Sequence, residues 1–207
     1  MNPRDVIQPG PAAVVLAAGE ARRFGGAKLA MPFGDSTVIG CVVRALAGAG
    51  LEPIIVVVGA NRAEIGTALA GTSVQIVENP DPGRGMLSSV QIGVAAVPQE
   101  ASKFVLALSD QPRICAADVT HLLAEQQRSG KGIALPVHAG KRGHPIVFDA
   151  RYRRDILSLG PEATLRDVIH GHIGDAVEVE FASDAFVRDI DTQEQYQDER
   201  RKADSDR

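Results

Sequence analysis

The stretch from Ala12 to Lys28, AAVVLAAGEARRFGGAK, decides the fold. It begins with an aliphatic run, Ala12–Ala17, which has no polar side chain and includes adjacent valines. Such a run is typical of a strand that is buried on both faces of a sheet. A glycine-rich loop between Gly19 and Gly26 follows directly. In open α/β sheets, ligands bind at the carboxyl ends of the strands, so this loop is the first place to look for a site.

The rest of the chain alternates aliphatic runs with segments of helical periodicity, which predicts βαβ units and a parallel sheet with helices on both faces. We expect residues 1–207 to form a single domain, with flexible tails at 1–11 and 203–207. The predicted helices are Thr37–Ala49, Arg62–Ala70, Met86–Val97, Ala117–Arg128, Glu162–Ile169 and Gln193–Lys202. The predicted strands are Ala12–Ala17, Pro53–Val58, Val74–Val77, Phe104–Leu108, Gly132–Pro136, Pro145–Phe148, Glu178–Phe181 and Phe186–Ile190.

The composition narrows the class of protein. Hydrophobic residues make up 44% of the 207 residues and aromatic residues only 4%, so we expect a full, aliphatic core. A net charge of −4 argues against a nucleic-acid-binding protein. We expect no membrane span and no signal peptide, because no apolar stretch is long enough and the first residues are polar; the predicted location is the cytoplasm. Cys41 and Cys115 are interpreted as two buried thiols.

The loop after the first predicted strand can bind an anion. Small residues at Ala17, Ala18 and Gly19 allow a phosphate to approach the backbone, whose N–H groups can form an anion-binding nest. Arg23 and Lys28 add positive charge for a polyphosphate. The loop is neither a Walker A motif nor a G-x-G-x-x-G motif. From these residues alone, a solvated turn remains an alternative.

The loop also fits the pattern L-A-A-G-x-x-x-R-[FM]-G-x-x-K, which resembles the signature loop of the MobA-like nucleotidyltransferases. The resemblance extends from Val14 to about Tyr196. It implies a three-layer, Rossmann-like α/β fold with a mostly parallel, mixed sheet. It also implies catalytic roles for Lys28, Arg23 and Asp110 and contacts to the nucleotide. Those contacts are expected from Leu16, Ala17, Ala18, Gly19, Arg23 and Lys28.

Two acidic positions are candidates for holding Mg²⁺. Asp110 follows a predicted buried strand in the string Ser109-Asp110-Gln111-Pro112, where a carboxylate would face the phosphate loop. An Asp that only stabilises a turn is the alternative. The stretch Asp189-Ile190-Asp191-Thr192 resembles the family's second metal position; Asp191 is the first choice and Asp189 the second. Helix capping by Asp191 or Thr192 is the alternative there.

Two further strings resemble the branch of the family that acts on the molybdenum cofactor. Gly85, Ser88 and Ser89 open a predicted helix, and by the resemblance they contact the nucleotide, although capping explains the serines equally well. Relatives that transfer a guanylyl group tend to have L-A-G-G and G-P-L-A-G at these two loops, so the departures favour CTP over GTP. The string R-G-H-P implies an acceptor-binding role for Arg142, Gly143, His144 and Pro145; an exposed basic turn is the alternative.

Taken with the resemblance, the sequence predicts an Mg²⁺-dependent enzyme that transfers CMP from CTP to the phosphate of molybdenum-bound molybdopterin and releases pyrophosphate. A molybdenum hydroxylase is a possible recipient of the product. The alternatives are a transferase that uses another nucleotide, such as GTP, or a sugar or alcohol phosphate acceptor. A non-catalytic protein that carries the cofactor and a nucleotide-binding regulator are alternatives from other classes.

Overall fold

The computed structural model describes residues 10–19, 24 and 27–205. Its main element is an eight-stranded mixed sheet with the order β10-β7-β9-β6-β1-β4-β5 and with β8 paired to β7. The inner pairs β6–β1–β4–β5 are parallel, whereas β9 runs antiparallel to both β6 and β7. The strands are β1 (Ala12–Ala17), β4 (Ile54–Val58), β5 (Val74–Glu78), β6 (Lys103–Leu108), β7 (Ile133–His138), β8 (Lys141–Arg142), β9 (Ile146–Asp149) and β10 (Ala176–Glu180).

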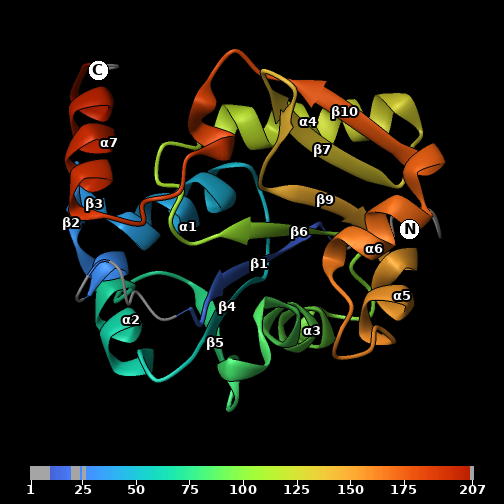
Figure 1. The fold of residues 1–207 in the computed structure, drawn as a ribbon, viewed down its shortest axis with the longest axis horizontal. Coiled ribbons are helices and arrows are strands. Elements are labelled where there is room, and N and C mark those ends of the chain that lie inside the picture. The colour runs from blue at the N-terminus through green and yellow to red at the C-terminus, as the bar shows by residue number, and fades with distance from the viewer. Residues whose placement is uncertain (1–9, 20–23, 25–26, 206–207) are drawn as a thin grey trace, which may run out of the picture.

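Helices cover both faces of this sheet, so the fold has the predicted three layers and is Rossmann-like (Figure 1). The α-helices are α1 (Val38–Gly48), α2 (Arg62–Ala68), α3 (Met86–Ala96), α4 (Ala116–Ser129), α5 (Arg153–Leu157), α6 (Leu165–Gly171) and α7 (Gln193–Ser205). Short 3-10 turns are η1 (Lys28–Ala30), η2 (Pro82–Arg84), η3 (Ala150–Tyr152), η4 (Ile173–Asp175) and η5 (Asp184–Val187). A small hairpin joins β2 (Pro32–Phe33) to β3 (Ser36–Thr37).

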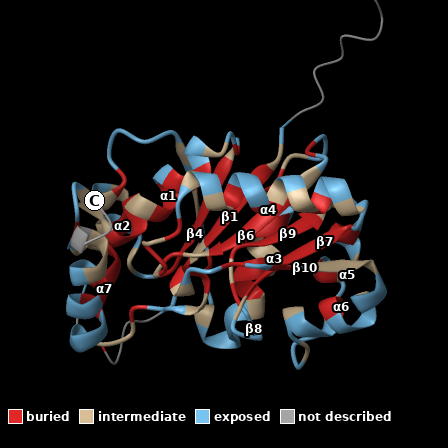
Figure 2. Ribbon diagram, turned by 90° about the horizontal axis from the view of Figure 1, so that it is seen from above, coloured by how far each residue is buried: buried red, intermediate tan, exposed pale blue. Residues whose placement is uncertain are grey.

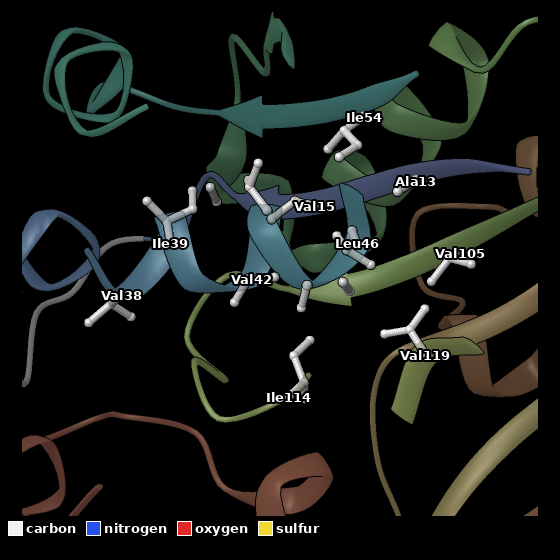
Figure 3. Packing of buried hydrophobic residues seen from close by; sticks show 14 of the residues in the cluster. Ala13, Val15, Val38, Ile39, Val42, Leu46, Ile54, Val105, Ile114 and Val119 are labelled. Carbon is white, nitrogen blue, oxygen red and sulfur yellow. The ribbon is translucent and has the colours of Figure 1, made fainter. Parts of the chain in front are cut away.

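The side-chain alternation of β1 divides the core into two halves. Ala13 and Val15 face the half that contains α1 and α4, whereas Val14 faces the half that contains α3, α5 and α6. Figure 3 shows Ile39, Val42 and other residues of α1 against the first half, and Figure 2 shows the buried strands as a band between helices with exposed outer faces. Because both faces are covered, the central strands are continuous aliphatic runs, as the sequence predicted.

Helix α3 lies unusually close to the sheet. An added Cβ at Gly93 would stand 2.3 Å from Val14 Cγ1 and 2.9 Å from Val57 Cγ2, so the glycine allows the helix to pack directly on β1 and β4. Gly85 and Met86, at the start of α3, line the same cavity as Ala18 and Gly19 of the loop that follows β1. The position of α3 therefore sets the spacing between two walls of the site described below.

Some sequence predictions were wrong. Phe186–Ile190 was predicted as a strand, but it begins in η5 and continues as irregular chain; Phe186 and Ile190 are buried anchors rather than alternating strand residues. The helix predicted over Glu162–Ile169 begins at Leu165, because Thr164 and Asp167 form a capping box. Cys115 was interpreted as buried, but it is exposed at the start of α4, and Cys41 is half-buried.

The hairpin β2–β3, strand β8 and helix α5 were not predicted, since each is too short to give a periodic pattern. Within the described part of the chain, no helix is long and apolar enough to cross a membrane.

Candidate active site

The carboxyl ends of β1, β4 and β6 border a cavity of about 590 Å³. In α/β folds, ligands bind at this edge of the sheet, outside the carboxyl ends of the parallel strands. Residues from six segments of the chain line it: Leu16, Ala18 and Gly19; Lys28 and Leu29; Ala60, Asn61 and Glu64; Pro82, Gly85, Met86 and Ser89; Leu108, Ser109 and Asp110; and Asp189 and Asp191.

A lysine between two carboxylates forms the charged part of the cavity. Lys28 Nζ lies 2.7 Å from Asp110 Oδ2 and 3.6 Å from Asp191 Oδ1. The Lys28 side chain is only 10% exposed, against 19% for Asp110 and 35% for Asp191. The three residues come from η1, from the end of β6 and from the segment before α7, so only the fold brings them together.

Asp110 is fixed by the backbone around it. Ser109 donates through its Oγ to the carbonyl oxygen of Leu16 at 2.7 Å, which ties the end of β6 to the end of β1. The backbone N–H of Ile190 donates to the carbonyl oxygen of Asp110 at 3.1 Å, which ties the C-terminal segment to the same place. Burial raises the pKa of the Asp110 carboxyl, and the adjacent Lys28 ammonium opposes this rise.

Gln111 connects the two acidic segments and was missed by the sequence analysis. Its Nε2 donates to Asp189 Oδ1 at 2.8 Å and to the carbonyl oxygen of Phe186 at 3.0 Å. The side chain is 2% exposed, so these bonds hold the 186–189 segment in a dry environment. Asp189 therefore lines the cavity and accepts a hydrogen bond from Gln111, whereas Asp191 contacts Lys28 directly.

The backbone loop after β1 is supported from β4. Asn61 donates through Nδ2 to the carbonyl oxygen of Ala17 at 2.9 Å and accepts from the N–H of Gly59 at 3.0 Å. A Cβ at Gly59 would stand 3.1 Å from the carbonyl oxygen of Ala18, so the two loops lie in close contact. Neither Asn61 nor Gly59 was predicted, because the sequence gives no signal for a contact between distant loops. Arg23 lies outside the described residues.

The two serines at the start of α3 differ in position. Asn79 Nδ2 donates to the hydroxyl oxygens of both Ser88 and Ser89 at 2.9 Å. The Ser88 hydroxyl also donates to the carbonyl oxygen of Gly85 at 2.8 Å, so it holds the start of the helix. Within the part of the chain that the structure describes, Ser89 and Gly85 line the cavity, but Ser88 and Ala17 do not.

The predicted acceptor residues lie outside the cavity lining among the described residues. Arg142 is exposed and donates from Nε to Glu178 Oε1 at 2.6 Å, so it pairs with β10. A Cβ at Gly143 would stand 2.0 Å from the carbonyl oxygen of Phe186, which is the physical reason for glycine there. Pro145 is buried.

His144 is the member of this string that is electrostatically coupled to the site. Burial lowers its pKa to about 4, the Asp110 carboxylate opposes this shift, and the Arg166 charge adds to it. His144 is therefore neutral at neutral pH. Its backbone N–H donates to the carbonyl oxygen of Phe186 at 3.0 Å, the same atom that accepts from Gln111.

The two carboxylates beside Lys28 fit an Mg²⁺ that is also bound by substrate phosphates, rather than a metal held by protein side chains alone. In the described ranges, no group of three or more His, Cys, Asp or Glu side chains forms a metal cage. Mg²⁺ commonly takes only one or two carboxylates from a protein and completes its octahedron with water and substrate phosphates. Asp110 and Asp191, which share contacts to Lys28 and line the same cavity as Gly19, meet that description.

A comparison with known families identifies the family of this chain. The sequence model described as the MobA-like NTP transferase domain matches residues 13–177. This chain belongs to the MobA-like NTP transferase family.

Two curated relatives of this family member have different names. The molybdenum cofactor cytidylyltransferase of Escherichia coli is 27% identical over 184 residues, covering 88% of this chain and 92% of the relative. The nicotine blue oxidoreductase of Paenarthrobacter nicotinovorans is 30% identical over 162 residues, covering 74% and 78%. Membership in the MobA-like family thus does not fix the acceptor.

Solved structures show the same fold. A nucleotidyl transferase from Methanothermobacter thermautotroptrophicus is 25% identical, has a TM-score of 0.79 and covers 92% of this chain and 95% of its own. Rv0371c of Mycobacterium tuberculosis in complex with manganese is 24% identical, has a TM-score of 0.71 and covers 90% and 96%. The MobA-like match ends at residue 177, so Asp189 and Asp191 lie in a segment beyond it.

Proposed function

We propose that this MobA-like protein transfers CMP from CTP to the phosphate of molybdenum-bound molybdopterin and releases pyrophosphate, with Mg²⁺ as the metal. The observation that carries the proposal is the cluster of Lys28, Asp110 and Asp191, which lines the same cavity as Ala18 and Gly19 of the loop after β1. Phosphoryl-group chemistry of this kind is largely a matter of positioning and charge stabilisation, and the cluster supplies both. The predicted location remains the cytoplasm.

Each group has a defined task in this proposal. The N–H groups near Ala18 and Gly19 bind phosphate oxygens, and Lys28 stabilises the negative charge that develops on the triphosphate. Asp110 and Asp191 would hold Mg²⁺, which when bound neutralises phosphate charge at the reacting phosphorus. An acceptor phosphate that is already ionised near neutral pH attacks the α-phosphorus in line, so no protein base is needed. A neutral His144 is consistent with this.

The choice of CTP and of a molybdopterin-type acceptor rests on the loop strings and on the name of the Escherichia coli relative. Ala18 provides one methyl group more than glycine would in the first loop, and Ser89 lines the cavity beside Gly85. The manganese complex of Rv0371c supports a divalent cation, and Mg²⁺ is our proposal. A molybdenum hydroxylase is the proposed recipient of the product.

The rival functions make different predictions in one assay. A cofactor carrier or a nucleotide-binding regulator releases no pyrophosphate, whereas a transferase with a sugar or alcohol phosphate acceptor releases it only with that acceptor. An oxidoreductase like the Paenarthrobacter nicotinovorans relative would instead change the absorbance of a redox partner without consuming nucleotide triphosphate.

The test compares pyrophosphate release by the wild type with release by Lys28→Ala and Asp110→Ala, in the presence of Mg²⁺, CTP and molybdenum-loaded molybdopterin. Loss of one charge contact to the transition state costs about 2.7–4 kcal/mol, so each variant should be at least roughly 100-fold slower. Lys131→Ala removes an exposed lysine that does not line the cavity and donates to the Gly174 carbonyl oxygen; it is the matched control and should retain full activity. Wild-type rates in both site variants would refute the site assignment.

A further inference from the structure

The position of Lys28 carries an inference beyond the transfer reaction itself. Its ammonium group contacts both carboxylates to which we assign the metal, at 2.7 Å from Asp110 and 3.6 Å from Asp191. A monovalent cation of the protein therefore lies between the same oxygen atoms that a divalent cation would need. Lys28 is 8% exposed as a residue, so the pair is shielded from solvent more than a surface ion pair.

Lys28 has two possible sets of anionic partners. It follows the glycine-rich loop and lines the same cavity as Gly19, which places it within the space where a triphosphate would lie. A lysine ammonium is a compact charge on a flexible four-carbon stem, so it can leave the carboxylates for phosphate oxygens by side-chain rotation. The neighbouring residue Leu29 is buried in the core, so the backbone of η1 is anchored next to Lys28.

The charges around Lys28 decide whether it weakens or strengthens metal binding. Among the described residues, Asp110, Asp191 and the nearby Asp189 place three carboxyl groups at this point, and Lys28 pairs with the first two. A divalent cation arriving alone must displace the lysine and leave its charge without a partner. When a triphosphate arrives with the metal, the lysine finds new partners while the metal takes the carboxylates. The binding of metal and of nucleotide is therefore coupled, and coupling of this kind is reciprocal.

We propose that Lys28 competes with the divalent cation for Asp110 and Asp191, and that the incoming triphosphate relieves this competition by drawing the lysine away. The enzyme thus favours the metal–nucleotide complex over free metal. This inference rests on the metal site of the proposed function. It gives Lys28 a second role, that of an internal counter-ion which keeps the two carboxylates from binding metal unproductively.

The experiment measures Mn²⁺ binding to the full chain by electron paramagnetic resonance, without nucleotide and at a mildly alkaline pH. Lys28→Gln removes the competing charge and keeps a polar side chain, and it should bind Mn²⁺ at least about tenfold more tightly than the wild type. Lys28→Arg keeps the charge and should stay close to the wild type. Lys131→Gln is the matched control and should leave the affinity unchanged.

A double variant, Lys28→Gln with Asp110→Asn, checks that the gained affinity belongs to this cluster, because it should lose the gain. Circular dichroism establishes that each variant is folded. Unchanged or weaker Mn²⁺ binding by folded Lys28→Gln overturns the competition, even where the wild type releases pyrophosphate. Tighter binding together with no pyrophosphate release by the wild type keeps the competition and refutes the proposed function, so the two failures are distinguishable.

Discussion

Replacing Gly93 by alanine should destabilise the protein, although alanine is the better helix former. The added methyl carbon would stand 2.3 Å from Val14 Cγ1 and 2.9 Å from Val57 Cγ2, at least an ångström short of ordinary contact in the first case. Both valines are fully buried in the central strands, so neither can move into free space. Overpacking of this kind costs about 1–3 kcal/mol, and the helix preference of alanine returns up to about 1 kcal/mol.

When the full helix preference is returned, the net loss is up to about 2 kcal/mol, which for a chain of this size lowers Tm by up to about 8 °C. Gly66→Ala is the matched control, because this glycine also lies within a helix and the nearest atom to its added carbon, Ile76 Cδ1, is 3.9 Å away. It should raise Tm by about 1–4 °C, since only the helix preference changes. Thermal unfolding by circular dichroism measures both, and equal shifts of the same sign would refute the reasoning.

Three further variants test other parts of the account. Tyr196 is 1% exposed, donates its hydroxyl to the Pro32 carbonyl oxygen and contacts the Phe24 ring edge-on. In denaturant unfolding, Tyr196→Phe should lower the free energy of unfolding by about 1 kcal/mol and Tyr196→Ala by about 3–5 kcal/mol. Equal losses would contradict the packing role of the ring. Burial lowers the pKa of His144 to about 4, so between about pH 4 and pH 6.5 the unfolded chain binds more protons than the folded chain. The contribution of His144 to stability is therefore fully present above about pH 6.5 and is lost as the pH falls toward 4. His144→Gln should flatten this slope in a series of unfolding measurements at different pH values. The Cβ added by Gly143→Ala would stand 2.0 Å from the Phe186 carbonyl oxygen, so this variant should lower Tm. The Cβ added by Gly174→Ala would have no atom within 4 Å, so that variant should leave Tm unchanged. Equal Tm values for the two variants would argue against the close contact at Gly143.

Sequence reasoning was reliable where one physical rule dominates. Strands buried on both faces must be aliphatic throughout, which identified β1, β4 and β6 within a residue or two. The rule that ligands bind at the carboxyl ends of such strands then selected the loops that contain Lys28 and Asp110. The structure places these two side chains in contact, 82 residues apart in the sequence.

Sequence reasoning failed where contacts between distant segments decide the structure. Phe186 and Ile190 have the spacing of a strand, but their segment is held by other contacts. Gln111 and His144 donate to the Phe186 carbonyl oxygen, and the Ile190 N–H donates to that of Asp110. The support of Ala17 by Asn61 and the salt bridge of Arg142 to Glu178 were unforeseen for the same reason. A single sequence contains no signal for which distant partner a polar side chain will find.

The most direct test follows labelled phosphorus from the nucleotide. Purified protein is mixed with Mg²⁺, molybdenum-loaded molybdopterin, and CTP labelled at either the α- or the γ-phosphate; GTP and ATP with the same labels are run in parallel. The account predicts that the α-label of CTP moves to the acceptor, that the γ-label appears in pyrophosphate, and that GTP and ATP transfer little. Transfer of the γ-label to the acceptor, or no transfer from CTP, would contradict it.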